Sequence, residues 1–85
     1  MTATGAQPTG AQWVEQFAAA LGVAPPSEGE TDALLAMAGV AAHASERTAA
    51  PLSAWLAGRA AITPAEAKAV AERLATQLAE GDHVS

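Results

Sequence analysis

The chain has no cysteine and no tyrosine, and its aromatic side chains are two tryptophans and one phenylalanine among 85 residues. Without thiols it can form no disulfide, no thiolate nucleophile and no zinc site of the cysteine type. The first residues lack the basic and apolar segments of a secretory signal, so we expect a cytoplasmic protein. Because large side chains are few and alanine is abundant, we also expect a thin core.

Positive charge is scarce as well, since four Lys and Arg stand against nine Asp and Glu and the net charge is −5. Proteins that bind nucleic acid gather Lys and Arg against the phosphate backbone, so we expect no nucleic-acid partner. The longest uncharged stretch of the helical part, residues 33–45, is much shorter than the roughly 20 apolar residues of a membrane span. We therefore expect no membrane partner.

Strand signals are missing, because β-branched residues are few and no segment alternates with a period of two. The pattern predicts an all-α fold, a compact four-helix bundle with a central apolar second helix. The length allows one domain. We expect a disordered leader over residues 1–10, a single helical domain over 11–81 and a flexible tail over 82–85.

Apolar spacing and capping residues predict where each helix lies. The first helix covers about residues 11–21, with Trp13 and Phe17 on its core face and Gly22 as its stop. The second begins near Ser27 and is apolar or small on almost every side over residues 33–45, which is typical of a central helix.

The third and fourth helices each begin at a proline, which needs no amide partner in the first helical turn. The third opens at Pro51 and is predicted to present Leu52, Trp55, Leu56 and Ala60 to the core. The fourth starts after the cap Thr63 and ends at Gly81. Small residues on the second helix, namely Ala36, Gly39 and Ala44, are expected to let neighbouring helices approach closely.

The segment AHASERTAAPLSAWLAG, residues 42–58, holds the residues with the most chemical character in the chain. A metal site at His43 would need further ligands, but the other histidine lies in the tail and no HExxH spacing occurs. Catalysis would need a nucleophile or an acid held against His43, and the sequence offers no such arrangement. We assign no catalytic residue, no metal ligand and no cofactor.

Two interpretations of this segment remain open. In the favoured one it is a structural joint, in which His43 binds a carbonyl at the end of the second helix, Glu46 pairs with Arg47, and Trp55 is core. In the other, the start of the third helix binds a phosphorylated compound together with Arg47 or Arg59, because helix N-termini favour anions. The candidate residues are His43, Glu46, Arg47, Pro51 and Trp55.

The same segment carries a family resemblance, through His43, Glu46, Arg47, Ala50-Pro51-Leu52, Leu56 and Gly58 in this order and spacing. Over residues 11–76 the chain resembles a small helical domain of unknown function common in actinobacteria. That domain occurs alone or fused to the carboxyl end of the molybdenum cofactor guanylyltransferase. The chain departs from the family pattern at Ala36 and Gly39, where an acid and an arginine are frequent.

The resemblance implies a non-catalytic accessory or protein-interaction module that acts with the guanylyltransferase in molybdenum cofactor biosynthesis. It does not imply nucleotidyl transfer, because that machinery belongs to the other domain and the chain has no glycine-rich nucleotide loop. Two alternatives stand beside it: a small-ligand module that binds a phosphorylated compound at the joint, and a structural homodimer.

Overall fold

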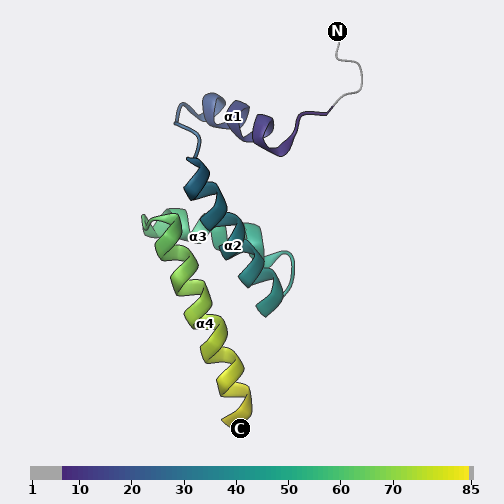
Figure 1. Cartoon of the computed structure of the whole chain (residues 1–85), viewed down its shortest axis with the longest axis vertical. Coiled ribbons are helices and arrows are strands. Elements are labelled where there is room, and N and C mark those ends of the chain that lie inside the picture. The colour runs from purple at the N-terminus through teal and green to yellow at the C-terminus, as the bar shows by residue number, and fades with distance from the viewer. Residues whose placement is uncertain (1–6, 85) are drawn as a thin grey trace.

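The computed structural model describes the backbone of residues 7–84 and the side chains of residues 7–81. It contains four α-helices: α1 (Gly10–Leu21), α2 (Glu28–Ala44), α3 (Ala49–Ala60) and α4 (Pro64–Val84) (Figure 1). The described part of the chain has no strand, and the prediction of an all-α bundle of four helices is confirmed. Residues 1–6 of the expected leader and Ser85 of the expected tail lie outside the described residues.

Three of the helices begin with a reciprocal capping box, which consists of two hydrogen bonds. The hydroxyl of the cap residue accepts a hydrogen bond from the backbone amide three residues later. The side chain of that later residue accepts a hydrogen bond from the backbone amide of the cap residue. All six hydrogen bonds measure 2.8 to 3.1 Å. The pairs are Thr9 and Gln12, Ser27 and Glu30, and Thr63 and Glu66. The caps Ser27 and Thr63 were predicted, whereas the cap Thr9 places the start of α1 inside the expected leader.

The helix ends differ in how well the sequence predicted them. Gly22 adopts φ 76°, the left-handed conformation expected of a glycine stop. By contrast, α3 begins at Ala49 rather than at Pro51. The expected end of the fourth helix at Gly81 is also wrong, because α4 continues to Val84. The earlier start of α3 agrees with the high helix propensity of Ala49 and Ala50.

Helix α2 occupies the centre of the bundle, as predicted, since it packs against both α3 and α4. Helices α3 and α4 do not pack extensively against each other. Helix α1 does not pack extensively against any other described helix. Helix α1 lies beyond the N-terminal end of α2 (Figure 1), and the molecule measures 59 × 27 × 19 Å. The packed part of the protein is therefore the set of α2, α3 and α4.

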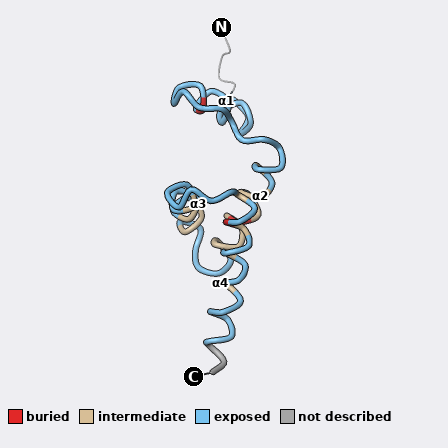
Figure 2. The backbone as a smooth tube through the Cα atoms, turned by 90° about the vertical axis from the view of Figure 1, so that its left-hand side faces the viewer, coloured by how far each residue is buried: buried red, intermediate tan, exposed pale blue. Residues whose placement is uncertain are grey.

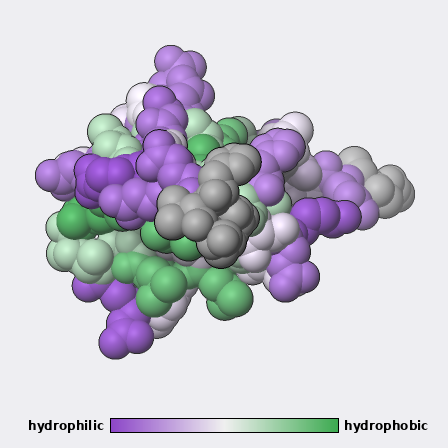
Figure 3. All heavy atoms as spheres, turned by 90° about the horizontal axis from the view of Figure 1, so that it is seen from below, coloured by the Kyte–Doolittle hydropathy of each residue, from purple (hydrophilic) through white to green (hydrophobic). Residues whose placement is uncertain are grey.

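The core is thin, as the composition predicted. Among the described residues only Ala18, Met37 and Ala67 are buried, and most of the backbone tube in Figure 2 belongs to exposed residues. Thirteen large hydrophobic side chains are exposed. Seen from below, hydrophobic patches lie beside hydrophilic ones on the molecular surface (Figure 3).

The predicted core face of α3 is wrong. Leu52, Trp55 and Leu56 are 64%, 67% and 59% exposed, and Ala60 is exposed too. The partly buried positions of this helix are instead Ala49, Ala50, Ser53 and Ala57. They follow the spacing of one helix face, and small side chains let the axes of α3 and α2 approach closely. Trp13 and Phe17 of α1 are likewise exposed, at 58% and 51%.

Candidate functional site

The joint between α2 and α3 is closed by backbone hydrogen bonds. The amide of Ser45 donates to the carbonyl of Ala41 over 3.0 Å and ends α2. The amides of Ala49 and Ala50 donate to the carbonyls of Glu46 and Arg47 over 2.9 and 3.1 Å. These bonds form a tight turn that leads directly into α3, so the conformation of the joint does not depend on side-chain contacts.

The structure distributes the five candidate residues over three separate surfaces. Glu46, Arg47 and Pro51 line one shallow hollow at the joint, together with Thr48. His43 lines a groove between α2 and α4. Trp55 lies on the exposed face of α3, so its predicted place in the core is wrong. The segment therefore does not fold into a single site.

The predicted side-chain contacts of the joint are also absent. Among the described residues, no hydrogen bond involves the side chains of His43, Glu46 or Arg47. The one salt bridge in this part of the chain joins Lys68 and Glu72 on α4, at 3.7 Å. All three joint side chains are exposed, and water satisfies exposed carbonyls and charges without a protein partner.

The start of α3 offers few donors to an anion. A helix N-terminus binds phosphate through amide protons that have no other partner. Here the amides of Ala49 and Ala50 already donate within the turn, and Pro51 has no amide proton. Thr48 has helical backbone angles and forms no side-chain cap. Arg59 lies in the last turn of α3, at the opposite end of this helix, so the expected phosphate site is reduced to the guanidinium of Arg47.

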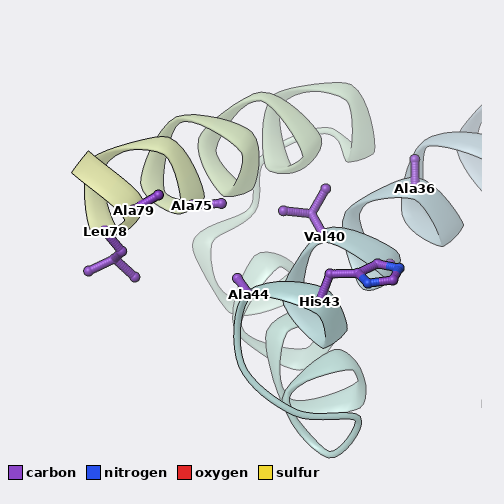
Figure 4. A pocket seen from close by; sticks show the side chains of 8 residues that line it. Ala36, Val40, His43, Ala44, Ala75, Leu78 and Ala79 are labelled. Atoms are coloured by element: carbon purple, nitrogen blue, oxygen red, sulfur yellow. The ribbon is translucent and has the colours of Figure 1, made fainter. Parts of the chain in front are cut away.

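A groove with a volume of about 640 Å³ lies between α2 and α4. Figure 4 shows residues of the C-terminal half of α2 facing residues of α4 across it. In this view Val40 projects between the two helices, and the ring of His43 is directed away from the side chains of α4. The lining residues are Ala36, Gly39, Val40, His43 and Ala44 of α2, and Ala75, Leu78 and Ala79 of α4.

Gly39 of α2 borders this open groove and does not lie against a neighbouring helix. A Cβ atom built on Gly39 would meet no atom within 4 Å. The expectation that Ala36, Gly39 and Ala44 permit close approach of a neighbour within the chain is therefore wrong at Gly39. The imidazole of His43 is the only titratable group among the lining residues, so the groove is chemically apolar.

Sequence reasoning missed the residues that α4 contributes to the groove. Ala75 and Ala79 lie four residues apart, which places two small side chains on one face of the helix. This spacing on α4, read together with the small residues of α2, could have indicated a shared surface. It could not have indicated whether that surface is closed or open.

In the described part of the chain, no group of three or more His, Asp or Glu side chains could hold a metal ion. None of the described helices is long and apolar enough to cross a membrane.

Comparison of the sequence with protein families identifies the group to which the chain belongs. The sequence profile of a domain of unknown function, DUF6457, matches residues 6–83. The chain belongs to the DUF6457 family. The match spans all four helices, so the DUF6457 domain includes both the joint and the groove. No curated protein and no solved structure matches the chain.

Proposed function

We propose that this DUF6457 domain is a non-catalytic protein-interaction module that acts in the cytoplasm as an accessory to another protein. The observation that carries the proposal is the open apolar groove between α2 and α4, in which His43 is the one titratable lining residue. Monomeric soluble proteins rarely leave large contiguous apolar patches in contact with water, and such patches commonly mark interaction sites.

The groove between α2 and α4 is the surface at which the partner binds. Apolar grooves between helices accept amphipathic helices, whose apolar face lies against the groove. Ala36, Gly39 and Ala75 give room for the backbone of such a helix to approach, while Val40 and Leu78 provide apolar contact. His43 supplies a polar contact at the edge. The bound segment is therefore an amphipathic helix with an uncharged contact face.

The first partner to test is the molybdenum cofactor guanylyltransferase. Its support is the resemblance to the actinobacterial domain that occurs fused to this enzyme, which implies that the two act together. The net charge of −5 favours a partner segment whose polar face is basic, because complementary potentials accelerate encounter. A phosphorylated small ligand at the joint has less support, because the amides at the start of α3 are occupied.

The test is binding of the full chain to the purified guanylyltransferase, measured by calorimetry and by light scattering after size exclusion, with and without guanine nucleotide. The decisive variant is Gly39→Leu, which places a bulky side chain in the groove where the structure has open space. We expect the affinity to fall by roughly tenfold or more, which corresponds to a loss of about 1.4 kcal/mol or more.

The matched control is Gly58→Leu on α3. Gly58 is also a helical glycine with no atom within 4 Å of a built Cβ, but it does not line the groove. This variant should bind like the wild type. Equal affinity of both variants would show that the groove is not the binding surface. No complex with the guanylyltransferase under any condition would remove that enzyme as the partner.

A further inference from the structure

We propose that two copies of the chain associate by exchange, with the aromatic face of α1 in one copy packed on the exposed apolar face of α3 in the other. The α1 face consists of Trp13, Phe17 and Leu21, and the α3 face of Leu52, Trp55 and Leu56. Neither surface is part of the groove, so this proposal does not rest on the proposed function.

Both faces are organised for contact and lack it. On α1 the rings of Trp13 and Phe17 stack with their centroids 5.9 Å apart and with 12° between their planes, although both side chains are more than half exposed. Leu52, Trp55 and Leu56 follow the three- and four-residue spacing that places side chains on one side of a helix. Helix α1 lies beyond the end of the bundle in Figures 1 and 2 and does not cover its own α3.

The two faces are also complementary in chemistry. Arg59 is three residues after Leu56 and four after Trp55, so it shares the exposed side of α3. Its guanidinium forms no salt bridge within the described chain. The α1 face carries two aromatic rings and no charge, and a guanidinium is attracted to the face of such rings. Two α3 faces against each other would instead bring two Arg59 side chains together, which favours pairing of α3 with α1.

The available area is sufficient for a dimer. The six side chains of the two faces are each more than half exposed in the single chain. Aromatic side chains contribute about 150–250 Å² each. Two reciprocal contacts between the faces would bury on the order of 1,500 Å², within the range of stable protein interfaces.

Reciprocal exchange also limits the proposed assembly to two copies of the chain. A contact between two different faces forms open chains unless its symmetry closes it. When each copy gives its α1 and receives the other's, both faces of both copies are used and none remains. No acidic residue belongs to either face, so the net charge of −5 per copy does not oppose the contact directly.

The test is the mass of the full chain in solution, by light scattering and sedimentation equilibrium from about 1 to 100 μM. We expect twice the monomer mass of 8.4 kDa at the upper concentrations. Trp55→Glu and Trp13→Glu should each give a monomer of unchanged helix content, because both side chains are exposed in the single chain. The matched control Leu74→Glu, at a 51% exposed position of α4, should remain dimeric.

Arg59 provides a second variant that leaves the apolar faces intact. Arg59→Glu should weaken dimerisation by about tenfold or more, and Arg59→Lys should retain most of the affinity because a cation remains over the rings. A wild-type monomer at 100 μM, or a stable dimer of either tryptophan variant, would overturn the proposal. Gly39→Leu should remain dimeric, so the mass measurement tests the dimer independently of partner binding at the groove.

Discussion

Helices α1 and α4 begin in the same way and lie in different surroundings. Each starts with a threonine whose hydroxyl accepts from an amide three residues on, over 3.1 Å in both cases. Each helix buries one alanine, Ala18 in α1 and Ala67 in α4, but α4 packs along α2, whereas α1 packs extensively on no other described helix. A capping box therefore determines where a helix begins. It has no bearing on whether the apolar face of that helix packs against another helix of the same chain.

Removal of Met37, the one large side chain that is buried in the described part of the chain, should separate the two regions most clearly. Met37 is 2% exposed at the centre of α2. Met37→Ala should lower the free energy of unfolding by about 2 to 5 kcal/mol, because it removes buried contacts and leaves a cavity. Urea unfolding followed by circular dichroism measures this loss.

The control is Leu35→Ala, two residues earlier on the same helix and 67% exposed. Its cost should be within about 0.5 kcal/mol, as for most surface substitutions. If both substitutions cost the same, α2 would not be the centre of the packed region and the distinction from α1 would fail.

Removal of a cap should have a smaller effect that depends on the region. Thr63→Ala should lower the global stability by about 1 kcal/mol, because α4 unfolds together with the helix it packs against. Thr9→Ala removes the same kind of hydrogen bond from α1 and should reduce helix content while the urea midpoint stays unchanged. A common shift of the midpoint in both variants would show that α1 belongs to the same cooperative unit.

The smallest expected effect is a gain in stability at the groove. Gly39→Ala should raise the free energy of unfolding by about 0.5 to 1 kcal/mol, because alanine restricts the unfolded chain and favours the helix. The added methyl group meets no atom within 4 Å, so no strain opposes the gain. Thermal unfolding checks this expectation, and a lowered midpoint would mean that α4 approaches Gly39 more closely than the structure shows.

The sequence predicted the central place of α2 in the bundle, but it did not predict which face of α3 is partly buried. Along α2, small and apolar residues occur on nearly every side, so any orientation buries apolar surface and a central place follows. Along α3, Leu52, Trp55 and Leu56 form one apolar face, and Ala49, Ser53 and Ala57 form another small one. Hydrophobicity favours the first face for the interior, whereas close packing of two helices favours the second.

The sequence located the turn between α2 and α3 but not the contacts around it. Backbone hydrogen bonds to Glu46 and Arg47 close this turn, and the expected side-chain contacts are absent from the described residues. The surface that contains His43 was not predicted, because three of its eight lining residues come from α4, more than thirty residues further along the chain. Spacing within one helix reports which residues share a face, but it carries no information about the distance to another helix.

By itself, the sequence determined the local features of this protein: the absence of strands, the capping boxes at Ser27 and Thr63, and the left-handed stop at Gly22. Each depends on hydrogen bonds or backbone angles within about four residues, so no distant contact is needed to specify it. Only the tertiary structure decided that Trp55 faces outward and that Gly39 borders an open groove. Those outcomes depend on how closely two helices approach, which is set by the side chains of both together.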